Sequence, residues 1–580
     1  MKRWVWAAVC VVLGLGMLVC GLLVPMHLRA VDASVLERAG RSTPGLVERG
    51  LALAGEKNVG AARILLQAAT AQGAVGREKL AEAVQALAAG SPGEVLGSEE
   101  PLLQRLFTGT AAKGPEPITE LVIRQENRAR VIEFLQASKW PGVRELVRCR
   151  TVTNTVFFPP STSTSGQAFD AALSVCGLLM QEGKLASGFS NVLWTAATQA
   201  TGLSHPLATA NPSAAQSPTR PLEEMLVDVM SLGQRFNWGQ MEIFMGQIPD
   251  AETLRLLAAL TRRADRQLPV LFSAVAVSGR PAEVAAYLAE FGQTGLTDLD
   301  AALRAGAGGL KEILARNQRW YQSPLRQRVA GHAPLDTFAW IAAEYSWLTP
   351  GLALAFKWTL YFGCGFLLAL GGHLSLPEVS GLERPLQVRG FHIARESLLG
   401  LGFLVVVVLF SEPFLDQVGQ KVEFPFRLHL PIVIGGAAPA ALANVKSSIM
   451  NFSLLTLLLF FVIQALIYTA CLLKLAEIRR QKVLARMKLK LLDNEDHLFD
   501  AGLYVGFAGT IISLILISQG VIKQPSLMAA YSSTSFGIIF VVIFKIFNLR
   551  PLRRRYLLES EPSSSVPAMS PRDPATATSS

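Results

Sequence analysis

Charged residues are scarce in this sequence. Asp, Glu, Lys and Arg make up only 17% of the 580 residues, whereas a soluble globular chain carries about 25%. Hydrophobic residues make up 51%, and the mean hydropathy is +0.35. A chain this apolar is not largely disordered, and its composition favours a membrane protein. Six cysteines in this length also exclude a disulfide scaffold.

Motifs that carry chemistry are missing as well. The sequence has no Gly-x-x-x-x-Gly-Lys-Ser/Thr phosphate loop, no His-Glu-x-x-His, no Cys-x-x-Cys and no Gly-x-Ser-x-Gly. Its seven histidines are scattered without the spacing of metal ligands. We therefore predict no catalytic residue, no cofactor and no metal site, and we expect a protein that is not an enzyme.

Six stretches are apolar enough to be read as transmembrane helices, which need about 20 residues each. They are Trp4–Val24, Leu352–Gly371, Glu396–Phe410 with a few residues on either side, Ser453–Leu473, Ala501–Val521 and Leu527–Asn548. The first exceeds the apolar core of about 7–15 residues in a cleaved signal peptide and favours an uncleaved signal anchor. Cleavage near Val31-Asp32-Ala33 stays open. Pro431–Val445 is short and holds Gly and Pro, which favours a re-entrant or surface loop.

Positive charge predicts the orientation of these spans. Lys and Arg gather at the N-terminus, in loop 374–395, in segment 474–500 and at residues 550–555, which are alternate loops of a six-span arrangement. The positive-inside rule then puts both termini in the cytoplasm and residues 25–350 outside, in the periplasm of a bacterium. Segment 474–498 is predicted to continue the fourth span as a helix with its basic groups near lipid headgroups. This distribution explains the net charge of +10 without nucleic acid.

Charge inside the spans is limited to their ends. Lys357 lies about five residues into the second span and is predicted to snorkel toward the interface. No Asp or Glu is expected at mid-membrane. This disfavours a transporter that would be driven by a carboxylate of this chain.

The outer region is predicted to be a large all-α domain, perhaps an irregular solenoid. Helical apolar spacing recurs at 46–53, 61–69, 78–89, 118–136, 168–181, 222–232, 251–264, 282–291 and 299–317. Thr151–Phe158 is the best strand candidate. Cys149 and Cys176 both lie in this region. Either a disulfide or two buried thiols is compatible with an oxidising compartment.

Breaks in the sequence suggest domain boundaries. Phe158–Gly166 and Gly202–Pro221 are rich in Pro, Ser and Gly and indicate a loop and a linker. The predicted organisation is 1–24 (signal anchor), 25–160 (first outer subdomain), 161–221 (helical segment and linker), 222–350 (second outer subdomain), 351–411 (spans two and three), 412–452 (outer loop), 453–550 (spans four to six) and 551–580 (disordered tail).

The last two spans carry small and hydroxylated residues. Residues 506–513 read Gly-Phe-Ala-Gly-Thr-Ile-Ile-Ser and residues 530–538 read Ala-Tyr-Ser-Ser-Thr-Ser-Phe-Gly-Ile. Such residues usually allow close helix packing, here through Gly506, Gly509 and Gly537.

The same residues resemble the MotA/TolQ/ExbB family of stator proteins over about 453–550. The resemblance implies pore-lining hydroxyls at Thr510 and Thr534, with Ser533 beside them, and an essential acid on a partner subunit. Segment 474–500 is shorter than in that family, and the family's proline after the second motif is absent.

Two functions follow as hypotheses. The first is a multi-pass bacterial inner-membrane protein, embedded in the lipid bilayer, that presents its periplasmic helical domain to a protein partner for binding or assembly. The alternative is a stator-like ion-channel subunit, homo-oligomeric, that works with a single-span partner. A solute transporter with an outer sensor domain is a third class, for which the sequence offers no site.

Overall fold

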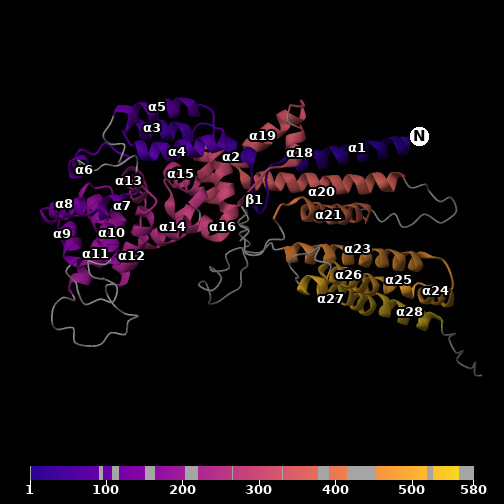
Figure 1. Cartoon of the computed structure of the whole chain (residues 1–580). Helices are drawn as coiled ribbons and strands as arrows, with labels where there is room; N and C mark the ends of the chain where they lie inside the picture. Colours follow the sequence, from indigo (N-terminus) through magenta and orange to yellow (C-terminus); the bar gives the residue numbers. More distant parts are fainter. Residues whose placement is uncertain are drawn as a thin grey trace, which may run out of the picture. The chain divides into compact units, whose positions relative to one another are not determined.

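The computed structural model describes residues 2–90, 96–107, 116–150, 164–202, 220–263, 265–329, 331–375, 391–414, 452–518 and 527–560. These residues are almost entirely helical (Figure 1), which confirms the all-α prediction. The strand candidate Thr151–Phe158, the loop Pro431–Val445 and most of the linker and the C-terminal tail lie outside the described residues.

The chain divides into two compact units. The short-helix unit comprises residues 30–328 and 343–348, and the long-helix unit comprises residues 1–29, 329–342 and 349–580. The elements of the short-helix unit are β1 (Ala30–Asp32), α2 (Ala33–Gly40), α3 (Leu46–Gly55), α4 (Val59–Gln72), α5 (Arg77–Gly90), α6 (Pro101–Leu106), α7 (Ile118–Ile123), α8 (Gln125–Gln136), α9 (Pro141–Cys149), α10 (Thr164–Gln181), α11 (Ser187–Gly202), α12 (Arg220–Gly233), α13 (Trp238–Met245), α14 (Ala251–Arg263), α15 (Leu268–Ser278), α16 (Pro281–Arg304), α17 (Gly306–Arg316), β2 (Arg319–Tyr321), α18 (Pro324–Val329) and the end of α19 (Leu335–Leu348).

One hydrophobic core runs through the short-helix unit, from Val31 to Leu314. Aromatic rings fill its middle: the ring centroid of Phe236 lies 5.1 Å from that of Phe244 and 5.6 Å from that of Phe272. The core includes residues on both sides of the boundaries predicted after residues 160 and 221. Isolated helices of this length are only marginally stable in water, so each short helix is stabilised by burying its apolar face in the core.

Two helices of this unit divide differently from the prediction. The helix expected over 118–136 breaks at Arg124, whose backbone is extended (φ −55°, ψ 128°). The region 282–317 has a kink at Gly292 (φ 55°, ψ −132°), where the predicted helix 282–291 ends, and it breaks again at Ala305 and Gly306, within the predicted helix 299–317. Gly306 has φ +88°, and a Cβ at the nearby Gly308 would lie 2.0 Å from the carbonyl oxygen of Ala39. The positive φ of Gly306, which glycine adopts readily, separates α16 from α17, and the close approach of α2 leaves no room for a Cβ at Gly308.

The long-helix unit contains α1 (Lys2–Leu23), α20 (Pro350–Ser375), α21 (Phe391–Ser411), α23 (Phe452–Arg480), α24 (Ala485–Asn494), α25 (Asp496–Phe499), α26 (Ala501–Ser518), α27 (Leu527–Phe544), η4 (Lys545–Leu549) and α28 (Arg550–Ser560). Within the described chain, four helical stretches are long and apolar enough to cross a membrane: Arg3–Leu23, Pro350–Ser375, Leu457–Arg480 and Tyr531–Ser560.

The prediction of six span-length helices is thus only partly confirmed. The apolar part of α21 begins after Glu396 and leaves residues 397–411, and the described apolar stretch of α26 is Ala501–Ile515. Both described stretches are shorter than the roughly 20 residues of an average span. The helix predicted to continue span four through 498 is also wrong in part, because α23 ends at Arg480 and α24 starts only at Ala485.

Small residues let the long helices approach closely. Figure 1 shows α1 beside α20, and α20 also contacts α21. A Cβ at Gly21 would lie 2.6 Å from the ring of Tyr361, and one at Gly365 would lie 2.9 Å from the Cα of Gly400. Such contacts between small residues and a neighbouring helix are the usual means by which apolar helices associate without a hydrophobic driving force.

Candidate functional site

A cluster of ionisable side chains is buried among the long helices. Lys357 of α20 has its Nζ 3.0 Å from Oε1 of Glu412, which follows the end of α21. The side chain of Lys357 is 1% exposed and that of Glu412 is 0% exposed. His27 follows α1, and its Nδ1 lies 3.3 Å from Nζ of Lys357. We call these three residues the Lys357 cluster.

Backbone groups complete the cluster. Nζ of Lys357 donates to the carbonyl oxygen of Met26 at 2.6 Å. The backbone N–H of Leu28 donates to Oε2 of Glu412 at 2.8 Å, and Nδ1 of His27 lies 3.6 Å from the same oxygen. Each carboxylate oxygen therefore has a donor beside it. A buried charge is tolerated when it is paired and hydrogen-bonded in this way.

The cluster corrects the prediction that Lys357 snorkels. Its ammonium group is turned into the protein, where a carboxylate and a carbonyl receive it. The surroundings are apolar and include Val24, Leu354 and Val408, so the pair acts in a medium of low dielectric constant. The arrangement ties together the end of α1, helix α20 and the end of α21.

The predicted hydroxyl pair of the last two long helices is also brought together. Oγ1 of Thr510 on α26 lies 2.5 Å from Oγ1 of Thr534 on α27. Thr510 donates to the carbonyl oxygen of Gly506 at 3.1 Å, and Thr534 Oγ1 lies 3.4 Å from the same oxygen. Ser533 is 1% exposed in the same interface. Both threonines thus contact each other and the backbone of α26.

The glycines of this motif lie at the closest approach of α26 and α27. A Cβ at Gly506 would lie 2.7 Å from the carbonyl oxygen of Ser533, and a Cβ at Gly509 would lie 2.5 Å from Ser533 Oγ. A Cβ at Gly537 would lie 2.7 Å from the carbonyl oxygen of Gly502. That same carbonyl accepts a hydrogen bond from Gln464 of α23 at 2.9 Å. This is the geometry expected of close helix packing.

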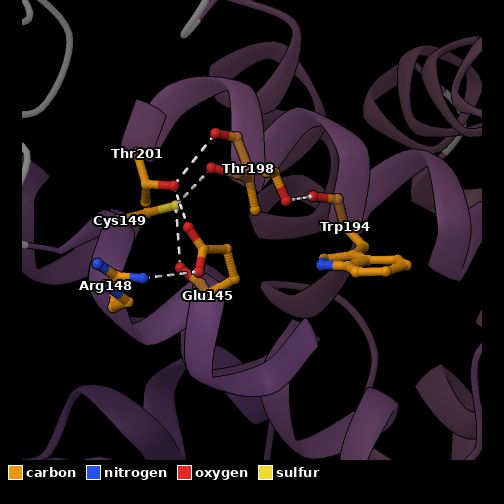
Figure 2. Close-up of polar contacts among 7 residues, drawn as sticks. Glu145, Arg148, Cys149, Trp194, Thr198 and Thr201 are labelled. Atoms are coloured by element: carbon orange, nitrogen blue, oxygen red, sulfur yellow. Dashed lines mark hydrogen bonds and ion pairs between the residues drawn. The ribbon is translucent and has the colours of Figure 1, made fainter. Parts of the chain in front are cut away.

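Cys149 and Cys176 are free thiols in the structure, so the disulfide alternative is not realised. Figure 2 shows Cys149 of α9 beside Glu145 and Thr201; its Sγ lies 3.3 Å from the carbonyl oxygen of Glu145 and 3.5 Å from that of Ala197. Cys176 is buried in α10. Burial raises the pKa of each thiol to about 12, so neither is a reactive thiolate near neutral pH.

No group of three or more His, Cys, Asp and Glu side chains is arranged to hold a metal ion in the described part of the chain. Comparisons with protein-family models, with curated proteins and with solved structures gave no match.

Sequence reasoning found the threonine and glycine motif but missed the Lys357 cluster. The signal was present. Lys357 lies near the start of one apolar helix and Glu412 lies at the end of the next, and successive antiparallel helices bring these two ends together.

Proposed function

We propose that the chain is a multi-pass protein of a bacterial inner membrane that presents the short-helix unit in the periplasm for binding or assembly with a protein partner, without catalysis. One observation carries this proposal. All four span-length helices of the described residues belong to the long-helix unit, while the short-helix unit has its own continuous core. A helical unit with its own core and no span-length helix among its described residues is suited to an aqueous compartment.

The finer topology is part of the same proposal. With α21 and α26 as two further spans, the Lys and Arg distribution supports six spans, cytoplasmic termini and a periplasmic segment 25–350. The Lys357 cluster supports α1 and α20 as antiparallel neighbours, because it joins the residues after α1 to the first turns of α20.

Cysteine labelling tests the topology. A membrane-impermeant maleimide applied to intact spheroplasts should label a cysteine at position 213 (Ser213→Cys) and spare one at position 563 (Ser563→Cys). Both should be labelled after permeabilisation. The parent chain is the control, because its own outer thiols are buried. The reverse pattern would overturn the orientation.

A fragment of residues 30–348 tests the autonomy of the periplasmic unit. It should be soluble and mainly helical by circular dichroism. Trp347 packs on the core and Arg316 donates to the carbonyl oxygen of Ser346 at 3.3 Å, so the fragment must extend to residue 348. A strand-dominated spectrum or an insoluble product would contradict the proposal.

The alternative is a stator-like ion-conducting subunit that works with a single-span partner. The sequence motif that contains Thr510 and Thr534 supports it, as does the lack of Asp and Glu in α26 and α27, since the acid would then come from the partner. Counting subunits in the purified particle separates the two functions. A five-fold ring would favour the stator subunit, and a monomer or dimer would favour the presenting protein.

A further inference from the structure

A charged groove lies at the end of the last long helix. Helix α27 continues through η4 into α28 without a break, and the side chains of η4 and α28 line a groove of about 1170 Å³. Its lining includes one lysine and four arginines but only two acidic residues, Asp496 and Glu559. Five positive and two negative charges leave the lining with a net charge of +3.

Ion pairs account for three of the five positive groups. Lys545 lies 2.7 Å from Asp500, Arg553 pairs with Asp493, and Arg555 lies 2.9 Å from Glu559. Arg550 and Arg554 form no ion pair with any residue that the structure describes, and both are exposed. Two guanidinium groups of one groove are thus available to an anion. The planar fork of Arg suits the oxygens of a phosphate group.

The position of the groove along the helix points to the source of that phosphate. Apart from Lys545, which is paired with Asp500, the stretch from Leu527 to Phe547 is apolar and rises about 30 Å at 1.5 Å per residue, which equals the thickness of the hydrocarbon core. Arg550 therefore follows at the level of the lipid headgroups. On the hydrocarbon side of Arg550, Phe547 is 72% exposed and Ile546 of the groove is 50% exposed. Apolar side chains beside a cationic groove suit a ligand that has both a phosphate and acyl chains.

We propose that this groove binds the headgroup of an anionic phospholipid, with Arg550 and Arg554 donating to the phosphate oxygens and Ile546, which lies on the hydrocarbon side of Arg550, contacting the acyl chains. The inference rests on the proposed placement in a membrane and goes beyond it. A general attraction of basic loops to the membrane surface would involve all exposed Lys and Arg residues alike. With a specific site in the groove, selectivity for anionic phospholipid depends on Arg550 and Arg554 only.

Native mass spectrometry of the full chain tests the site. The protein is purified in a mild detergent and mixed with equal amounts of phosphatidylglycerol and phosphatidylcholine. We expect selective retention of phosphatidylglycerol. Replacing both arginines (Arg550→Gln with Arg554→Gln) should weaken this binding about 30-fold, about fivefold for each Arg. The matched control is Arg480→Gln with Arg486→Gln, two exposed arginines outside the groove, which should change it less than about threefold because salt screens exposed charges that lie outside the site.

Each other outcome overturns the inference. Equal retention of the two lipids, or unchanged selectivity in the Arg550/Arg554 variant with native thermal stability, would exclude the site. An equal loss in the control variant would show that only net charge matters. Displacement of the lipid by millimolar inorganic phosphate would assign the groove to a soluble phosphate. Cell fractionation tests the proposed function separately, because a chain absent from the membrane fraction would contradict the membrane placement itself.

Discussion

Nζ of Lys357 lies 3.0 Å from Oε1 of Glu412, and both side chains are almost completely inaccessible to solvent. The two residues come from consecutive long helices, and the backbone after α1 supplies further partners to each of them. Replacing a buried ion pair by apolar residues often costs little, whereas removing one partner leaves an uncompensated charge. The pair therefore contributes more to the relative positions of these helix ends than to the net free energy of unfolding.

Breaking the pair should be costly. We expect Lys357→Met or Glu412→Leu alone to lower the free energy of unfolding by about 3–5 kcal/mol, because the remaining charge stays buried. The double variant should recover most of that loss. Denaturant titration of the detergent-solubilised protein measures both effects. Lys474→Ala, which removes a partly exposed pair with Glu477, should cost less than about 1 kcal/mol. Additive losses in the double variant would contradict the coupling.

The cluster also shows where sequence reasoning stops. The apolar run around Lys357 and the helices at 46–55, 59–72 and 77–90 follow from local patterns. The partner of Lys357 does not follow from a local pattern, because it requires the antiparallel pairing of two consecutive helices, and Lys357 taken alone is as compatible with snorkelling as with an ion pair. Similarly, β1 pairs in parallel with β2, Ala30 opposite Arg319. Two strands of three residues each carry no periodicity that a sequence pattern can reveal.

The residues of the threonine motif could be identified from the sequence because they are close together along the chain. Whether they pack helices or line a pore could not. We expect Thr510→Val with Thr534→Val to destabilise the protein by about 1–2 kcal/mol, since the two hydroxyls bond each other and the carbonyl oxygen of Gly506. If the chain presents a periplasmic domain and conducts no ions, ion flux in vesicles stays at the background level for the wild type and for the variant. Flux from the wild type with a single-span partner, lost in a variant of near-native stability, would favour the stator subunit.

Gly506 gives a sharper test of the interface between α26 and α27. Gly506→Ala should destabilise the protein by about 1–3 kcal/mol, because its new Cβ would lie 2.7 Å from a backbone oxygen that cannot move independently. Gly16→Ala is the matched control: it also lies within a long helix, and nothing is within 4 Å of its added Cβ. That variant should be stabilised by about 0.5–1 kcal/mol. Equal effects in thermal unfolding would contradict the close approach of the helices.

The buried thiols predict a pH dependence for the short-helix unit. Burial raises the pKa of Cys149 and Cys176 from 9.0 to about 12. Between these values the folded state keeps its thiol protons and the unfolded state loses them, so unfolding becomes easier as pH rises from about 9 to 12. At pH 10 each thiol should cost about 1.4 kcal/mol relative to pH 8. Denaturant titrations of the wild type and of Cys149→Ala with Cys176→Ala measure this. The variant should show a smaller loss over the same pH range, and identical losses would contradict the prediction.

Retention of the N-terminal helix is the last expectation. In the long-helix unit, Gly21 meets Tyr361 and the carbonyl oxygen of Met26 accepts from Lys357. In the short-helix unit, Val31 is 1% exposed and Asp32 caps α2, with Oδ1 3.0 Å from the N–H of Ser34. Cleavage after Ala33 would remove all of these partners and leave Lys357 and Glu412 without the backbone groups that satisfy them.

Intact-mass measurement of the protein purified from membranes checks this. We expect the mass to include residues 2–33. For comparison, a specific protease site is inserted between Arg29 and Ala30, and the purified chain is cleaved there. If α1 stays bound by its contacts with α20, the cut protein should keep the α1 fragment through purification. Adding Lys357→Met to the cut chain should release part of it, because the ammonium group no longer binds the carbonyl oxygen of Met26. A purified wild-type protein that begins after residue 33 and is still fully stable would contradict the structural role of α1.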